Sequence, residues 1–379
     1  MPEKSFKDTD RRKSIVWILC SNRWYSAITE YSLCSAKALS DLGYRVIYSP
    51  LDDSPADFKA RELDVQLEAV RSFNLLDWRR IRGIAKEHQP DVLMTFGGKE
   101  SVLTSLVVPN VRRFRFRGQN GDLTKRFETI RMIMSFWNQT IITPSKDLSK
   151  RIALGTGNKA FTVHLGRDSN SFGPCDRVDK GVNLASWRLA GRPEIQIFGR
   201  LDPVKGHREF LPVFKAFIDS FPIDDTVRPI LHIIGKPVNM TAEDIYQVAD
   251  KLGLDRGDLL ITSTQVSDPS RLMAKAVLGV ISSIDSEIIC RVGKEYLLSG
   301  TPILVSGVGT LDKLIHSKFG WSWKGLNFNK KVELLMESYK TSLSESDEVR
   351  IQRSSRAASL YSLENMGRRL ADVIALGAD

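Results

Sequence analysis

Four charged side chains in the second half of the chain have the types and spacing to bind a phosphorylated sugar. Arg200 and Lys205 stand in the stretch Gly-Arg-Leu-Asp-Pro-Val-Lys-Gly at 199–206. Glu287 and Glu295 follow far downstream, with seven residues between them. Arginine and lysine suit the oxygens of a diphosphate, whereas carboxylates accept hydrogen bonds from sugar hydroxyls. Together the four side chains indicate a site for a nucleotide-activated sugar.

The expected secondary structure places these residues where ligands bind in open α/β sheets. Arg200 and Lys205 follow a predicted strand at 195–198, at the carboxyl edge of a parallel sheet. Glu287 follows another predicted strand, and Glu295 lies in the first turns of the next predicted helix, whose N-terminus offers unpaired N–H groups. Each pair also has an ordinary interpretation, because surface cations often flank turns and glutamates often compensate a helix dipole.

Short apolar strands alternate with amphipathic helices in both halves of the chain. This alternation predicts parallel sheets with right-handed crossovers, the pattern of Rossmann-like α/β domains. Residues 172–194 are polar and rich in glycine and proline, so we expect them to join two domains, 1–175 and 176–345. The expected strands are 15–20, 45–48, 91–96, 113–117, 139–144, 195–198, 230–235, 259–261, 277–282 and 302–306.

Composition is that of a soluble globular protein large enough for two domains. The 379 residues are 42% hydrophobic and 26% charged, and no run approaches the roughly 18 apolar residues of a membrane span. The apolar run at 15–20 follows basic residues but is shorter than a signal core, so a buried first strand is the better interpretation. The four cysteines lie scattered, which favours reduced thiols in the cytosol over a zinc site.

Nearly all of the net charge of +10 lies in the first half. Residues 1–175 carry 28 Lys and Arg against 19 Asp and Glu, 28 − 19 = +9, and the remainder carries 27 − 26 = +1. The excess is concentrated at 11–13, 79–82 and 112–117. Such a face suits an anionic acceptor or a phospholipid surface, and it equally suits an ordinary solvated surface.

Taken in order, these segments resemble the retaining glycosyltransferases of family 4, which have the GT-B fold. The resemblance covers most of the chain and rests on several weak motifs in register. It implies two Rossmann-like domains with an intervening cleft and a C-terminal helix, 346–379, that crosses back onto the first domain. The matching segments are 138–149, 163–172, the Gly-Arg-Leu…Lys-Gly loop at 199–206, the Glu-x7-Glu element at 287–295, 299–304 and 361–365.

The resemblance assigns a role to each site residue. Arg200 and Lys205 would bind the donor diphosphate, and Glu295 would bind the ribose. Glu287 would bind the transferred sugar, while the backbone at Ile289 and Cys290 would approach sugar and phosphate. Transfer in the family retains the anomeric configuration, depends on stabilising the charge of the leaving phosphate, and needs no metal and no cofactor.

Three departures from the family pattern concern the sugar and the acceptor. Ile288-Ile289-Cys290 replaces the usual Gly-Phe-Gly, which predicts a reshaped sugar pocket. The first strand leads into 21–25 rather than a glycine-rich loop. Arg23 and Trp24 are therefore acceptor-side candidates, although Trp24 equally suits buried packing. Where many members carry a histidine, this chain has Gln119 and Asn120, which could orient a sugar but could not act as a general base.

The sequence thus predicts a hexosyltransferase-type enzyme of cell-envelope polysaccharide or lipopolysaccharide synthesis. Its partners would be a nucleotide-sugar donor, a glycan or lipid-linked acceptor and an anionic membrane touched by the basic first domain, with no nucleic acid. It would work in the cytoplasm or at the inner face of the membrane. The alternative is a catalytically silent protein that senses a nucleotide sugar or glycan. A dinucleotide-dependent oxidoreductase is disfavoured, because no Gly-x-Gly-x-x-Gly follows the first strand.

Overall fold

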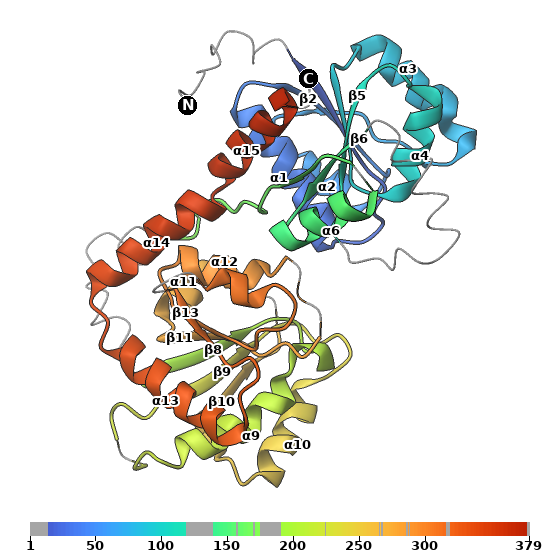
Figure 1. Ribbon diagram of the computed structural model, residues 1–379. Helices are drawn as coiled ribbons and strands as arrows, with labels where there is room; N and C mark the ends of the chain where they lie inside the picture. The colour runs from blue at the N-terminus through green and yellow to red at the C-terminus, as the bar shows by residue number, and fades with distance from the viewer. Residues whose placement is uncertain are drawn as a thin grey trace. The chain divides into compact units, whose positions relative to one another are not determined.

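The chain forms two compact units, each built on its own parallel sheet (Figure 1). Unit 1 comprises Met1–Gly166 and Ser362–Asp379, and unit 2 comprises Arg167–Tyr361. The predicted α/β architecture of two Rossmann-like layers is confirmed, and every strand expected from the sequence is present. The computed structural model describes residues 14–118, 139–156, 158–169, 171–174, 191–223, 225–264, 266, 268–285, 287, 289–315 and 319–376.

The sheet of unit 1 has the strand order β3-β2-β1-β4-β5-β6-β7, with all neighbours parallel. Its central strand β1 (Ile15–Cys20) is a continuous apolar run, as expected for a strand covered on both faces. The other strands are β2 (Arg45–Pro50), β3 (Gln66–Leu67), β4 (Val92–Thr95), β5 (Arg112–Phe116), β6 (Gln139–Thr143) and β7 (Ala160–Thr162). The helices are α1 (Ala27–Asp41), α2 (Pro55–Ala60), α3 (Trp78–His88), α4 (Gly98–Val107), α6 (Lys146–Thr156) and α15 (Leu363–Leu376).

Helices cover both faces of this sheet. On one face, Trp17 and Leu19 of β1 belong to the same buried cluster as Ile81 of α3 and Leu103 of α4. On the other face α1 packs against α15 (Figure 1). A glycine permits this approach, because a Cβ at Gly367 would lie 2.8 Å from the carbonyl oxygen of Ala38.

The sheet of unit 2 has the order β10-β9-β8-β11-β12-β13, again with parallel neighbours. Its core includes Phe210, Phe214 and Phe217, which recur every three to four residues along one face of α9. The strands are β8 (Glu194–Phe198), β9 (Ile230–Ile234), β10 (Leu259–Thr262), β11 (Leu278–Ile281), β12 (Ile303–Val305) and β13 (Gly320–Ser322). The helices are α9 (His207–Ile218), α10 (Ala242–Lys251), α11 (Pro269–Lys275), α12 (Arg291–Leu298), α13 (Phe328–Leu343) and α14 (Asp347–Tyr361).

Each sheet has one point at which successive connections leave in opposite directions. In unit 1 this switch point lies between β1 and β4, and in unit 2 it lies between β8 and β11. The loops after two such strands diverge at the carboxyl edge and leave room for a ligand between them. In unit 2 the loops are 199–206 and 282–290, the two segments in which the sequence predicted donor contacts.

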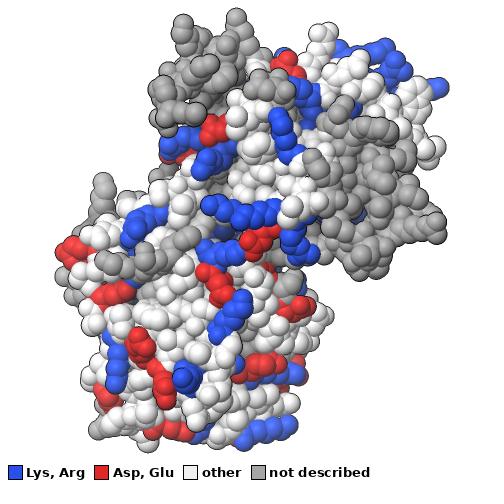
Figure 2. Space-filling model, in the orientation of Figure 1, with Lys and Arg blue, Asp and Glu red and all other residues white. Residues whose placement is uncertain are grey.

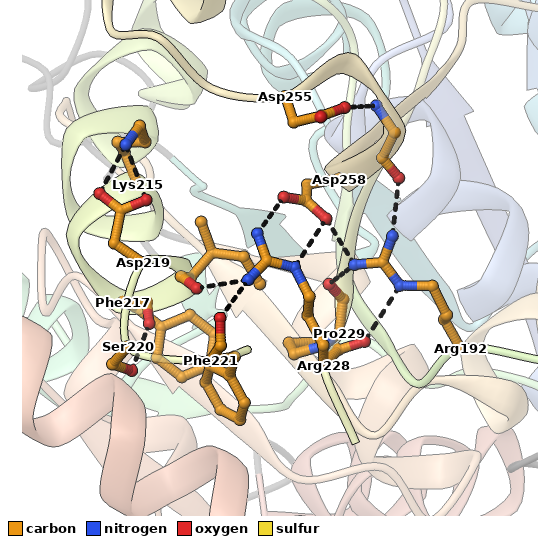
Figure 3. Close-up of polar contacts among 12 residues, drawn as sticks. Arg192, Lys215, Phe217, Asp219, Ser220, Phe221, Arg228, Pro229, Asp255 and Asp258 are labelled. Carbon is orange, nitrogen blue, oxygen red and sulfur yellow. Dashed lines mark hydrogen bonds and ion pairs between the residues drawn. The ribbon is translucent and has the colours of Figure 1, made fainter. Parts of the chain in front are cut away.

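A buried ion-pair network closes the opposite, amino edge of the unit 2 sheet (Figure 3). Asp258, just before β10, receives two hydrogen bonds from Arg228 at 2.5 and 3.2 Å and one from Arg192 at 2.5 Å. Arg228 also donates to the carbonyls of Ile218 and Phe221 at 2.9 and 2.6 Å. The network therefore ties the starts of β8, β9 and β10 to the end of α9.

The chain returns to unit 1 only after α14. Arg350 of α14 is 1% exposed and donates to the carbonyl oxygens of Ala276 and Ala274 at 3.1 and 2.6 Å, which anchors this helix in unit 2. Phe172 is likewise part of a buried cluster of unit 2. The units divide at 166/167 and 361/362, whereas the expected boundaries were 175/176 and 345/346. The difference arises because Phe172 and Arg350 bind the segments that contain them to unit 2.

The visible surface of unit 2 carries both signs of charge, with basic and acidic side chains interspersed (Figure 2). This distribution agrees with the near-neutral balance of the second half of the sequence. Among the described residues, no helix is both long enough and apolar enough to cross a bilayer.

Asp258→Asn is expected to lower the free energy of unfolding by about 3 to 5 kcal/mol, because it leaves a buried arginine without its counter-charge. Asp250→Asn is a matched control, since its bidentate pair with Arg256 is exposed to solvent, where ion pairs contribute little to stability. Urea unfolding of both variants measures the difference. Equal losses would contradict a structural role for the buried network.

Candidate functional site

The candidate site of unit 2 lies at the carboxyl ends of β8 and β11, where glycines let two loops touch. Gly206 has φ +68, and a Cβ there would lie 2.1 Å from the carbonyl oxygen of Ser282. Ser282 in turn donates its hydroxyl to the carbonyl of Lys205 at 2.8 Å. The loop carrying Arg200 and Lys205 is therefore held against the loop that leads to Glu287.

Lys205 and Glu287 form an ion pair across the two loops. Glu287 also accepts a hydrogen bond from the Ser283 hydroxyl at 2.9 Å, and its carbonyl accepts one from the Thr310 N–H at 2.8 Å. Gly309 fits beside it only because it lacks a side chain. The structure thus brings together a cation and a carboxylate that are far apart in sequence.

Arg200 is the more exposed of the two predicted phosphate-binding cations. Its side chain is 55% exposed and lies 3.3 Å from the carboxylate of Asp202. Asp202 is buried, and it caps the short 3₁₀ turn Pro203–Lys205 by accepting from the Val204 N–H at 3.1 Å. The turn that presents Lys205 is therefore set by Asp202, whose role the sequence reasoning missed.

His207 contacts the same loop through the backbone of Arg200. It is fully buried at the first position of α9, and its Nε2 lies 3.1 Å from the carbonyl oxygen of Arg200. Burial lowers the pKa of the imidazole, so it is neutral at pH 7 and donates to that carbonyl. His207 acts as a structural residue at the helix start, in line with the interpretation from sequence.

Glu295 lies in α12 and is paired with an arginine that the sequence reasoning did not single out. The Arg167 guanidinium lies 2.7 Å from Glu295 Oε1 and 5.5 Å from the ring of Phe172. Both charged side chains are largely buried, at 18% and 11% exposure. Arg167 belongs to the segment 163–172, but its position in the sequence does not predict a contact with α12, which lies far downstream.

Ile289 and Cys290 form the entry into α12, and their side chains are buried. Burial, followed by the charge of Glu287, raises the pKa of the Cys290 thiol to about 12, so the thiol is neutral at physiological pH. These residues can offer backbone groups and an apolar wall to a ligand, but no thiolate. Ile288 lies outside the described residues.

In unit 1 the acceptor-side candidates occupy the loop after β1. Arg23 is exposed and Trp24 is 78% exposed, so the indole is available for stacking rather than packed in the core. Gln119 and Asn120 lie outside the described residues.

The sequence reasoning also missed Glu100, which is fully buried at the start of α4, on the other side of the unit 1 switch point. It accepts from the Ser21 N–H at 3.1 Å and so ties the β1 loop to the β4 loop. Burial raises the pKa of this carboxyl. No sequence motif predicts this contact between a buried glutamate and the backbone of another loop.

Comparison with solved structures identifies the fold of the chain over nearly its whole length. No protein-family model and no curated protein matches the sequence, but solved structures do match. HepE of Anabaena, solved in complex with UDP, gives a TM-score of 0.74 at 14% identity over 95% of this chain and 99% of HepE. The chain has the GT-B fold. The predicted fold class is thereby confirmed.

Other GT-B structures give the same result. A glycosyltransferase of Rickettsia africae has a TM-score of 0.74 at 14% identity, over 97% of this chain and 98% of its own. WaaG, a glycosyltransferase involved in lipopolysaccharide biosynthesis, has a TM-score of 0.60 at 14% identity, over 95% and 99%. At such identities the likeness concerns the fold alone.

Gly309→Ala is expected to destabilise unit 2 by about 3 kcal/mol or more, because φ is +63 and a Cβ would lie 2.4 Å from the carbonyl oxygen of Glu287. Gly325→Ala is the matched control: its φ is +72, nothing lies within 4 Å of a Cβ, and it should cost about 1 to 2 kcal/mol. Chemical denaturation measures both. A loss at position 309 no larger than at 325 would mean that Glu287 is not held by this packing.

Proposed function

We propose that the protein is a retaining glycosyltransferase that moves a sugar from a nucleotide-diphosphate sugar to a glycan or lipid-linked acceptor. One observation carries the proposal. Both predicted cations and both predicted carboxylates lie near the switch point of unit 2, on the diverging loops or on the helix after them. The GT-B fold supports it, because the structures it resembles include HepE bound to UDP-glucose and the lipopolysaccharide galactosyltransferase WaaB.

In this proposal Arg200 and Lys205 bind the diphosphate. Phosphate oxygens would replace the carboxylates that now face these cations, so each cation would keep an anionic partner. Glu287 would then be free to accept hydroxyl hydrogen bonds from the sugar, while Ser283 keeps its carboxylate in place. Glu295 would accept from the ribose hydroxyls, with Arg167 fixing one of its oxygens.

The chemical step breaks the bond between the anomeric carbon and the phosphate oxygen. Arg200 and Lys205 stabilise the negative charge that develops on the leaving phosphate. The acceptor hydroxyl attacks from the same face, forms the new glycosidic bond and passes its proton to that phosphate. This route needs no protein nucleophile, no resident metal and no cofactor. It agrees with a buried, neutral Cys290.

The acceptor would lie on unit 1, at the loop that presents Arg23 and Trp24. An exposed indole beside a cation suits a sugar ring attached to an anionic group. We therefore propose an acceptor of the cell-envelope type, reached in the cytoplasm or at the inner membrane face. The structural neighbours WaaG and WaaB are named for lipopolysaccharide biosynthesis and its outer core, which supports this class of acceptor.

A silent sensor of nucleotide sugars is the second candidate. It is favoured by Ile289 and Cys290, whose buried side chains bring no polar group to the sugar end. Calorimetry with a panel of nucleotide sugars, followed by assays of donor hydrolysis and transfer, separates the two. Tight binding without either reaction on any acceptor would favour the sensor.

Lys205→Ala and Glu295→Ala are each expected to lower transfer or donor hydrolysis at least about a hundredfold, because each removes a contact to the donor. Lys215→Ala, which breaks an i, i+4 pair with Asp219 in the same unit, is the matched control and should keep full activity. Circular dichroism checks folding. Unchanged turnover in both site variants would overturn the donor assignment.

Arg167→Met is expected to weaken nucleoside-diphosphate binding about five- to tenfold, because Glu295 loses the cation that orients it. In a Glu295→Gln background the same change should have little further effect, since the two residues act as a pair. Isothermal titration with the four variants of the cycle measures the coupling. Additive losses would show that Arg167 does not act through Glu295.

A further inference from the structure

The donor loop, residues 199–206, is held by a second loop, residues 235–240, which follows the neighbouring strand β9 (Figure 1). The two loops continue the parallel pairing of β8 and β9 beyond the strands. The Leu201 N–H donates to the carbonyl of Lys236 at 2.8 Å, and the Val238 N–H donates to the carbonyl of Leu201 at 3.1 Å. The course of the donor loop therefore depends on a segment in which the sequence predicted no site residue.

One side chain of the second loop binds the donor loop directly. Asn239 donates its amide to Asp202 Oδ2 at 2.9 Å. Asp202 is 3% exposed, and its other carboxylate oxygen accepts from the Val204 N–H, the contact that shapes the turn before Lys205. In the part of the chain that the structure describes, the Asp202 carboxylate has two side-chain partners, Asn239 and the half-exposed Arg200. These two side chains share one buried carboxylate.

The two partners of Asp202 respond differently to an incoming anion. A phosphate that binds Arg200 takes the place of Asp202 beside the guanidinium, whereas the neutral amide of Asn239 is not drawn away. A buried carboxylate is costly to leave without hydrogen bonds, so Asp202 relies more on Asn239 once Arg200 has turned to a phosphate. An interaction that is stronger in the bound state than in the free state raises the affinity for the ligand. The Asn239 hydrogen bond has this property.

We propose that Asn239 is a positioning residue for the diphosphate of the donor. It holds Asp202, and through Asp202 the turn that presents Lys205, while Arg200 exchanges its carboxylate partner for a phosphate. The inference rests on the proposed function, because it takes Arg200 and Lys205 as the diphosphate-binding cations. Asn239 acts through Asp202 and does not itself contact the donor. A loop without any recognisable motif thereby sets the affinity for the nucleoside diphosphate.

Asn327 provides a matched control for a purely structural asparagine. Like Asn239 it is exposed in unit 2 and makes one side-chain hydrogen bond, here as the N-cap of α13, where it accepts from the Lys330 N–H at 3.0 Å. No predicted site residue lies in this helix start. Asn327→Ala is therefore expected to lower the melting temperature, because it removes a helix cap, and to leave nucleotide affinity unchanged.

Isothermal titration of the full chain tests the proposal. Titration with UDP, GDP, ADP and dTDP identifies the nucleoside diphosphate that the wild type binds most tightly, and the variants are titrated with that ligand. Asn239→Ala should raise its dissociation constant about five- to tenfold, because Asp202 loses a donor on which the bound state depends. Asn239→Asp should raise the dissociation constant further, since a second carboxylate would then face Asp202. Circular dichroism checks that both variants are folded.

A double-mutant cycle with Arg200 separates positioning from general stability. In an Arg200→Met background Asp202 has no guanidinium to lose on binding, so Asn239→Ala should change the dissociation constant less than about twofold, measured at millimolar ligand. Hydrogen exchange gives a second readout without ligand. Residues 200–206 should exchange faster in Asn239→Ala than in the wild type or in Asn327→Ala, because the turn has lost the side chain that holds Asp202.

Two results would overturn the inference alone. They are wild-type affinity in both Asn239 variants, or an equal loss from Asn239→Ala with and without the Arg200 side chain. Either result, with tight binding by the wild type, would leave the assignment of Arg200 and Lys205 to the diphosphate standing. A wild type that binds none of the four nucleoside diphosphates would overturn the proposed function and this inference with it.

Discussion

The candidate donor site depends on the adjacency of β8 and β11 in a parallel sheet. Because the chain runs outward in opposite directions from these two strands, the loops after them diverge at the carboxyl edge of the sheet. Gly206 and Gly309 then let backbone segments approach more closely than any side chain would allow. The positions of Lys205 and Glu287 follow from these two constraints.

Within that edge, each predicted cation faces a carboxylate: Lys205 with Glu287 and Arg200 with Asp202, while Arg167 neutralises Glu295. Apart from the half-exposed Arg200, these charges are largely buried and would be costly without a partner, so the pairs hold the side chains in defined places. In the proposed function, a phosphate of the donor would take the place of a carboxylate beside Lys205 or Arg200, so that each cation keeps an anionic partner. The hydroxyls of the donor would then donate hydrogen bonds to the carboxylates of Glu287 and Glu295.

Arginine–aspartate pairs occur at both edges of the unit 2 sheet but differ in how exposed the arginine is. At the amino edge, Asp258 accepts from both Arg192 and Arg228, and these arginines spend most of their remaining N–H groups on backbone carbonyls. At the carboxyl edge, Arg200 is half-exposed, and its guanidinium lies 3.3 Å from the carboxylate of Asp202. Unit 1 repeats the contrast, with arginines near β5 bound to carbonyls and those of α3 facing solvent.

Local sequence was enough to predict the long strands, because a continuous apolar run such as 15–20, or the mainly apolar run 230–234, has few alternatives to a buried parallel strand. It missed β3, β7 and β13, which are two or three residues long and only half-buried. It also placed Arg200, Lys205 and Glu287 in loops after predicted strands and Glu295 in the first turns of a predicted helix, as the structure has them, while their contacts with a donor stay a prediction. Only the tertiary structure decided their partners. Arg167 meets Glu295, and Arg350 ties α14 to unit 2, through packing between segments far apart in the chain, and no periodicity or turn signal encodes such contacts.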